Sequence, residues 1–171
     1  GRRETATLFM TLLGGLDVLM SQYSGQEDVV IGTDIANRNR AEIEGLIGFF
    51  VNQLVLRVRS NASESFSKLL KQVKDVCLGA FAHQNVPFEK LVEELQPERD
   101  LSRSPLFQVK LSLQNALQDG LWLEGMRLLG EGGNQTQTAK LDLTVDITDV
   151  RQELVGRHRV RHAPVLERFD L

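Results

Sequence analysis

The chain contains 171 residues, of which 42% are hydrophobic and 25% are charged, values close to those of an average soluble globular domain. Its 20 Lys and Arg residues nearly balance its 23 Asp and Glu residues, and the net charge of -3 gives no electrostatic reason to expect nucleic acid or an anionic membrane as a partner. A single cysteine excludes an internal disulfide and a multi-cysteine metal site, and it is consistent with a reducing, cytoplasmic compartment. No apolar run approaches the roughly 20 residues that a membrane-spanning helix needs.

The N-terminal residues show neither an initiator Met nor the organisation of a signal peptide, so we expect the chain to be part of a longer protein. The first element is a predicted helix, because leucines recur at helical spacing over residues 8–19. A polar turn follows. Residues 29–33 are a short apolar, β-branched run, which is typical of a strand covered on both faces. Residues 42–46 are expected to form one helical turn.

Residues 47–58 predict a long strand, because apolar residues alternate along most of this range. The alternation slips once, near Asn52 and Gln53. Such a slip is typical of a bulge, where one extra residue is inserted, or of a strand that changes sheet face. Asn52 is therefore a polar residue inside an otherwise apolar predicted strand.

The clearest helix is predicted to begin at Ser63, a good N-cap residue, and to run to Phe81 with apolar residues at helical spacing. Pro87 is well suited to the start of a second, short helix over residues 88–95. Residues 97–105 form a charged, proline-bounded loop, in which Asp100 and Arg103 are expected to make a local ion pair.

Three candidate strands complete the chain, at residues 109–113, 121–129 and 141–147. The last of them has the clearest alternation of apolar and polar residues, which indicates a strand with one buried face. No internal repeat and no low-complexity linker interrupts the pattern. The sequence therefore predicts a mixed α/β layer structure.

The residues that could carry chemistry do not assemble into a reactive centre. Cys77 lies on the apolar face of the predicted helix, which is typical of a structural cysteine. His83 lies at the end of that helix, where a histidine commonly meets the terminal carbonyl groups. His158 and His162 have the spacing of a metal-ligand pair, but the arginines around them disfavour a divalent cation. We therefore predict no metal site.

Three segments follow one another along the chain. They are Ile-Gly-Phe-Phe-Val-Asn-Gln-Leu-Val-Leu-Arg at 47–57, His-Gln-Asn-Val-Pro-Phe-Glu at 83–89, and Arg-Asp-Leu-Ser-Arg-Ser-Pro-Leu-Phe-Gln at 99–108. In this order and spacing they closely resemble the later motifs of condensation domains from nonribosomal peptide synthetases. The resemblance covers about residues 5–156. The chain departs from the family pattern at Asn85 and Ser104, where the family usually has Asp and often has Asn.

This resemblance implies a fold similar to chloramphenicol acetyltransferase, in which two α/β lobes meet around a tunnel. We expect residues 1–156 to be the C-terminal lobe, a mixed sheet flanked by helices. The resemblance also implies partners: carrier proteins whose phosphopantetheine arms bring in two substrates, neighbouring synthetase domains and the missing N-terminal lobe. The amine of one substrate attacks the thioester of the other, and an amide forms. No cofactor is expected to bind the chain directly.

The family's reactive signature, His-His-Xaa-Xaa-Xaa-Asp-Gly, does not occur in the chain. We therefore assign no catalytic residue here and expect the isolated chain to be inactive, although the parent protein is expected to be an enzyme. Asn52 is the predicted substrate-binding residue, facing the tunnel; the alternative is a bulge residue bonded to the backbone. Two other functions stay open, namely a non-catalytic module that docks carrier proteins and a coenzyme A-dependent acyltransferase of the same superfamily.

Residues 157–171 form a divergent basic tail. After Gly156 the family leads into a strand similar to Val-Ile-Glu-Tyr-Ala-Thr, whereas residues 157–165 are Arg-His-Arg-Val-Arg-His-Ala-Pro-Val. A DNA segment can be written that encodes Val-Ile-Glu-Tyr-Ala-Thr-Pro-Leu-Phe in one reading frame. With one extra base inserted before it, the shifted frame encodes residues 157–165 without a mismatch. We hypothesise a single-base frameshift just after Gly156. A final strand is then expected to be absent or irregular, since cationic side chains are costly to bury.

Overall fold

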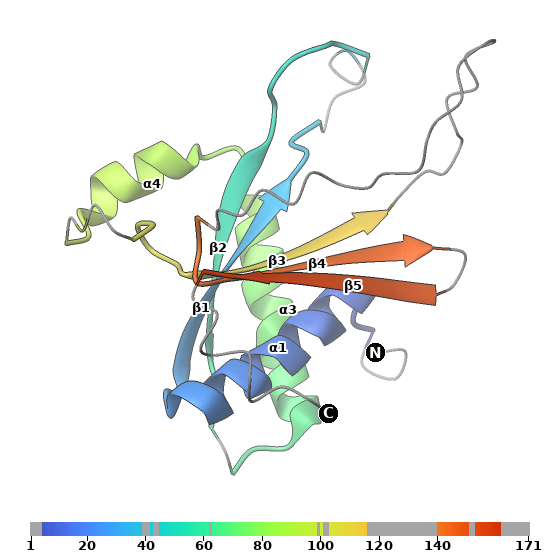
Figure 1. Cartoon of the computed structure of the whole chain (residues 1–171), viewed down its shortest axis with the longest axis vertical. Coiled ribbons are helices and arrows are strands. Elements are labelled where there is room, and N and C mark those ends of the chain that lie inside the picture. The colour runs from blue at the N-terminus through green and yellow to red at the C-terminus, as the bar shows by residue number, and fades with distance from the viewer. Residues whose placement is uncertain are drawn as a thin grey trace.

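The structure is a computed structural model, and it describes residues 5–38, 42, 45–61, 63–98, 100, 103–115, 140–150 and 153–161. Within these residues a mixed five-stranded sheet carries helices α1 and α3 on one face, while α4 stands apart from them (Figure 1). The elements are α1 (Leu8–Ser24), β1 (Asp28–Ile35), β2 (Asn52–Arg59), α3 (Phe66–Ala82), α4 (Phe88–Leu95), β3 (Val109–Asn115), β4 (Leu143–Val150) and β5 (Glu153–Val160). None of the described helices is both long enough and apolar enough to cross a lipid bilayer.

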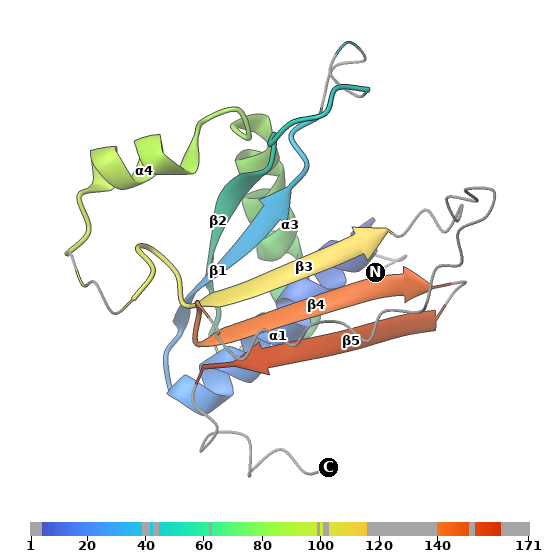
Figure 2. The same cartoon turned by 45° about the horizontal axis from the view of Figure 1, so that its top comes forward.

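The strand order is β2-β1-β3-β4-β5, and the sheet consists of two well-paired groups. β1 and β2 are antiparallel over their whole length, and β3, β4 and β5 form a second continuous group. The groups are joined by a short parallel register, Ile31 opposite Val109 and Gly32 opposite Lys110. Beyond these pairs β1 and β3 diverge, so that the sheet splays open (Figure 2).

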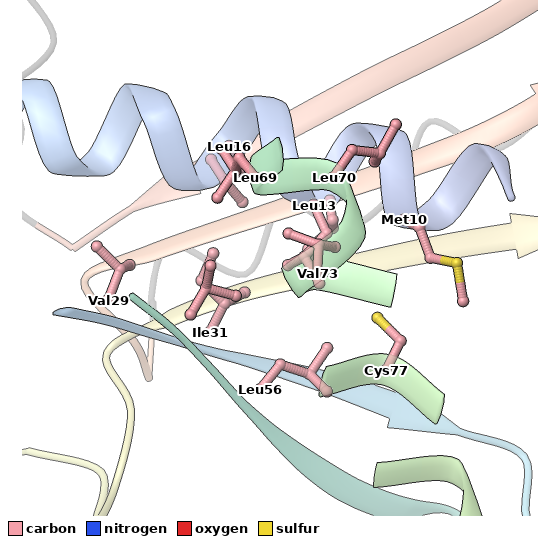
Figure 3. Close-up of a cluster of buried hydrophobic side chains, with 12 residues drawn as sticks. Met10, Leu13, Leu16, Val29, Ile31, Leu56, Leu69, Leu70, Val73 and Cys77 are labelled. Atoms are coloured by element: carbon pink, nitrogen blue, oxygen red, sulfur yellow. The ribbon is translucent and has the colours of Figure 1, made fainter. Parts of the chain in front are cut away.

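The hydrophobic core lies between the sheet and the two helices α1 and α3 (Figure 3). Its fully buried side chains come from each layer and include Leu13, Ile31, Leu56, Val73 and Cys77. Burying a side chain of this size contributes about 1.5–3 kcal/mol. Because side chains alternate along a strand, the residues between these core positions lie on the opposite face of the sheet, which α1 and α3 do not cover.

Each of the two long helices is preceded by a residue whose hydroxyl accepts a bond from one of the free N–H groups of the first turn. The Thr7 hydroxyl accepts a bond from the Met10 amide at the start of α1, so the predicted helix is confirmed and extends to Ser24. For α3 the predicted N-cap, Ser63, is wrong, because the capping residue is Ser65. The amide and hydroxyl of Ser63 both donate to the Asn61 side chain, and this local turn delays the helix by two residues.

The long strand predicted over residues 47–58 is also wrong at its start, since β2 begins at Asn52. There is no bulge, because the pairing of β1 with β2 runs without interruption from Asn52 to Arg59. The residues before it bond to an arginine instead of to a strand. The Arg38 guanidinium donates to Leu46 O (2.7 Å) and Gly48 O (3.4 Å) and lies 4.5 Å from the centre of the Phe50 ring. The slip in alternation therefore marks the beginning of a strand.

The predicted strands at 109–113 and 141–147 are confirmed as β3 and β4, the latter shifted to begin at Leu143. The expectation that the final strand is absent or irregular is wrong. β5 includes Arg157–Val160 of the predicted basic tail and pairs with β4 along its whole length. Among the described strands β5 lies at the edge of the sheet, and the side chains of Arg157, His158 and Arg159 are exposed, so this segment joins the sheet without burying a charge. Arg159 also reaches Asp146 at 2.9 Å.

The frameshift hypothesis itself stays a prediction about the DNA. Resequencing the codons for residues 157–165 tests it, and codons incompatible with the shifted frame would refute it. Residues 162–171 lie outside the described part of the chain, as does the candidate strand at 121–129.

Candidate functional site

The candidate site lies on the face of the sheet that α1 and α3 leave uncovered. Here the ends of β1 and β2, the C-terminal residue of α4 and the loop before β3 surround an open cavity of about 630 Å³. Figure 2 shows α4 and this loop on the same side of the molecule. The cavity is lined by Gln26, Glu27, Asp28, Val30, Val55, Arg57, Leu95 and Leu106. Its walls are therefore aliphatic, with charged groups at one end.

Asn52, the predicted substrate-binding residue, is the first residue of β2, and its amide bonds to the turn that connects α3 with α4. Its Nδ2 donates to Gln84 O and to Val86 O, each at 2.8 Å. Its Oδ1 accepts from the Phe88 backbone N–H at 3.1 Å. The Asn52 side chain is thus bonded to the backbone, as the alternative interpretation expected, but Asn52 does not lie in a bulge. Substrate contact by Asn52 stays a prediction.

The loop before β3 is fastened to the sheet by an aromatic ring. Phe107 is buried, and its ring lies over Gly32 of β1. A Cβ atom at position 32 would come within 2.3 Å of that ring, so glycine is required here. Phe88, the first residue of α4, meets the Phe107 ring edge-on with the ring centres 5.7 Å apart. Leu106, next to Phe107 and in the cavity wall, has a φ of 70°, a strained value for leucine.

Two ionic clusters lie on the same face of the sheet. Asp34 of β1 accepts from Lys110 of β3 at 2.8 Å and from Gln53 of β2 at 3.1 Å, which ties three strands together where β1 and β3 begin to diverge. At the other end of β1, Asp28 pairs with both Arg57 and Arg59 of β2. The bidentate bond from Arg57 lowers the pKa of the Asp28 carboxyl below its usual range.

Asp17 is a feature that sequence reasoning missed. It lies on α1 among core residues, its side chain is fully buried, and neither carboxyl oxygen makes a hydrogen bond. Loss of hydration on burial raises the pKa of this carboxyl. The helical spacing of Asp17 from Leu13 is the signal that could have placed it on the buried face.

The residues weighed as reactive groups are far from this face or exposed. Cys77 is buried in the core, where loss of hydration raises the pKa of its thiol to about 11 and disfavours the thiolate, so the structural interpretation is confirmed. His83 is the C-cap residue of α3, as its position predicted. His158 is exposed on β5, and His162 lies outside the described residues. Within the described ranges no cluster of His, Cys, Asp and Glu could hold a metal ion.

The charged loop between α4 and β3 contains the expected local contact. Asp100 and Arg103 approach to 4.0 Å, and the Arg103 amide donates to the Asp100 carbonyl at 3.2 Å. Both side chains are exposed, so this pair shapes the loop without making a buried site. The cavity itself offers both aliphatic and charged side chains to a ligand. Among the described residues they do not combine a nucleophile with a base.

Comparisons with known proteins give a consistent picture. A sequence model of the condensation-domain family matches residues 2–155. The chain is 49% identical over 156 residues to a linear gramicidin synthase of Brevibacillus parabrevis, an alignment that covers 91% of this chain and 3% of that protein. It is also 48% identical over 145 residues to tyrocidine synthase 3 of the same organism, covering 85% of this chain and 2% of that protein. The chain thus spans only a small part of the length of these relatives.

Two solved structures extend the likeness to the fold. One is holo-AB3403, a four-domain nonribosomal peptide synthetase bound to AMP and glycine; it has a TM-score of 0.78 and 25% identity over 95% of this chain and 14% of its own. The other is the complex of the X-domain and OxyB from teicoplanin biosynthesis, with a TM-score of 0.72 and 26% identity over 90% of this chain and 34% of its own.

Proposed function

Because the chain belongs to the condensation-domain family, we propose that it is one lobe of a domain that joins carrier-bound aminoacyl or peptidyl thioesters through an amide bond in nonribosomal peptide synthesis. The observation that carries this proposal is the family match over residues 2–155. It is supported by the sheet with helices on one face, a fold of the chloramphenicol acetyltransferase type shared with known condensation domains. The open face then offers its cavity and polar groups to the substrates.

The proposed reaction forms a C–N bond and breaks a C–S bond. The amine of one substrate attacks the thioester carbonyl of the other, the phosphopantetheine arm leaves as a thiolate, and the proton that the amine loses ends on that sulfur as the free thiol. The chain contains three His residues, none of them adjacent to another, so it lacks the paired histidines of the family signature. We therefore assign the catalytic histidine to another part of the protein. The lobe described here contributes one wall of the substrate tunnel.

The proposal implies particular partners. Carrier proteins supply the phosphopantetheine arms, and the N-terminal lobe and neighbouring synthetase domains complete the assembly. The exposed side chains of Ile47 and Phe49, on the segment that precedes β2, are suited to contact another part of such an assembly. The free thiol of Cys77 fits a reducing cytoplasm.

Amide formation by the full-length protein tests this function. The protein is incubated with one carrier loaded with a donor aminoacyl group and a second loaded with an acceptor, and the acceptor is analysed by mass spectrometry. Dipeptidyl product above the rate without enzyme supports the proposal. The matched control is the chain of residues 1–171 alone, which is expected to give no product because it lacks the paired histidines. Failure of the full-length protein with every tested substrate pair would contradict the proposed activity.

A second function, a binding module without catalysis, is favoured by one comparison. The X-domain, which resembles this chain in fold and sequence, has been solved as a complex with OxyB. A domain of this type can therefore present a surface to a protein partner. The two functions separate in one experiment: a module binds a loaded carrier in calorimetry but yields no dipeptidyl product, whereas a condensation domain does both.

A further inference from the structure

Helix α4 is poorly supported by apolar packing. It has eight residues, none of them buried, and its last residue, Leu95, is 59% exposed. A helix this short is marginal in water when it stands alone. Its apolar residues Phe88, Leu91 and Val92 are only half-buried, so its position depends strongly on the contacts at its N-terminal end.

Asn52 supplies the main contact there, acting as a cap from a distant strand. The N-cap residue of α4 is Pro87, which makes no side-chain cap hydrogen bond. The Oδ1 atom of Asn52 accepts the bond from the Phe88 amide in its place. The two N–H groups of the same amide satisfy Gln84 O and Val86 O. One side chain thus bonds to both sides of Pro87.

The Phe88 ring adds a second anchor on the same residue. It meets the buried Phe107 ring, which lies over Gly32 of β1. The two anchors fix the start of α4 relative to both β1 and β2. At the other end of the helix, Leu95 forms part of the cavity wall together with Leu106. The placement of α4 therefore determines how far this wall stands from Val30 and Val55 on the sheet.

We propose that Asn52 is a positioning residue, which holds α4 over the open face of the sheet and so sets the shape of the cavity. Its amide acts through the turn and not by touching the substrate. The placement of α4 follows from the contacts alone. The effect of this placement on the reaction rate rests on the proposed function, so the position of α4 and the formation of product are measured separately.

Hydrogen exchange in the full-length protein, followed by mass spectrometry, tests the placement. Asn52→Ala removes three hydrogen bonds, and the amides of α4 are expected to exchange about ten- to a hundredfold faster. The amides of α3 are expected to keep their rates, because α3 is held by the core. Gln53→Ala is the matched control: it removes an amide from the next residue, whose bond goes to Asp34, and should leave α4 unchanged.

A second variant distinguishes positioning from a packing defect. Asn52→Asp keeps an acceptor for the Phe88 amide but turns an oxygen toward Gln84 O and Val86 O. The ionised carboxylate repels both carbonyls, whereas the protonated form can donate to one of them. Protection of α4, relative to the wild type at the same pH, should therefore recover as the pH falls. The nearby titratable groups are Asp34, which bonds to the neighbouring Gln53, and His83 and Glu89, which flank the turn; all three are present in both proteins.

Three results would overturn the proposal: unchanged exchange of α4 in Asn52→Ala, equal acceleration in α3 and α4, or a loss of protection in Asn52→Asp that does not vary with pH. Amide formation is measured on the same preparations. If the wild type forms product, the kcat of Asn52→Asp, relative to the wild type at the same pH, should rise as the pH falls, in parallel with the protection of α4. If either Asn52 variant loses kcat while the amides of α4 exchange at the wild-type rate, Asn52 contacts the substrate directly, and the positioning proposal is overturned. If the wild type forms no product, the proposed function fails, and exchange alone decides the positioning proposal.

Discussion

Two consecutive helices of this protein, α3 and α4, are held in opposite ways. α3 has 17 residues and places Leu69, Leu70, Val73 and Cys77 in the core. α4 has eight residues, buries none of them and is held at one end by an asparagine and a pair of phenylalanine rings. Apolar burial gives the first helix its stability, whereas hydrogen bonds and one aromatic contact give the second its position. Substitutions around α3 should therefore lower the free energy of unfolding strongly, whereas substitutions around α4 should have smaller effects on stability.

The largest effect is expected in the core that holds α3. Leu56→Ala removes a fully buried side chain from β2 and should lower the free energy of unfolding by about 2–5 kcal/mol. Leu95→Ala, the matched change at the exposed end of α4, should cost less than about 1 kcal/mol. Urea unfolding of the full-length protein and its variants, followed by circular dichroism, measures both. Equal losses would break the distinction between the two regions.

A smaller loss is expected where the loop next to α4 meets the sheet. Gly32→Ala places a methyl group within 2.3 Å of the Phe107 ring and should destabilise the protein by about 1–3 kcal/mol. Gly15→Ala is the control, because the site on α1 is open, and alanine there should stabilise the helix by up to about 1 kcal/mol. Thermal unfolding of both variants shows whether each substitution raises or lowers the melting temperature. If Phe107→Ala does not reduce the cost of Gly32→Ala, the ring is not its cause.

On the face of the sheet that α1 and α3 cover, the buried carboxyl of Asp17 is expected to lower stability in a pH-dependent way. Burial raises its pKa in the folded state, so the folded protein binds the proton more tightly than the unfolded chain does. Stability is therefore lost as the pH rises above the unfolded value, and Asp17→Asn should be more stable than the wild type at pH 7, by roughly 1 kcal/mol. The difference should vanish in acid below the unfolded pKa. Urea midpoints across pH 3–8 check this, and a gain that persists in acid would contradict it.

The smallest effect is expected at the exposed ion pairs beside the cavity. The pKa of Asp28 is lowered in the folded state by Arg57, so its contribution is present above the unfolded pKa and is lost as the pH falls through the folded value. Arg57→Ala should produce only a slight fall in melting temperature, and the fall should disappear in concentrated salt. Lys90→Ala, which removes exposed pairs within α4, serves as the comparison. A large loss that resists salt would show that the Arg57 pair is more than a surface contact.

Local patterns in the sequence account for several elements of this fold. Helical periodicity predicted α1 and most of α3, Pro87 indicated the start of α4, and alternation predicted β3 and β4, because each of these signals depends on near neighbours along the chain. The ordered motifs identified the family, which the match over residues 2–155 confirms. The burial of Cys77 followed from its place on an apolar helix face. For these features, adjacent residues contain the information that is needed.

Contacts between distant segments decided the rest. Arg38 bonds to residues 46 and 48, which precede β2, and pairing with β4 places a basic segment in the strand β5. Asn52 could be recognised as unusual in an apolar run, but its partners became known only when the strand and the α3–α4 turn were placed side by side. The sequence thus determined which residues can form helices, strands and a core. The tertiary structure decided which polar groups meet, because hydrogen bonds and ion pairs require their atoms to be within about 3–4 Å, a condition that no local pattern encodes.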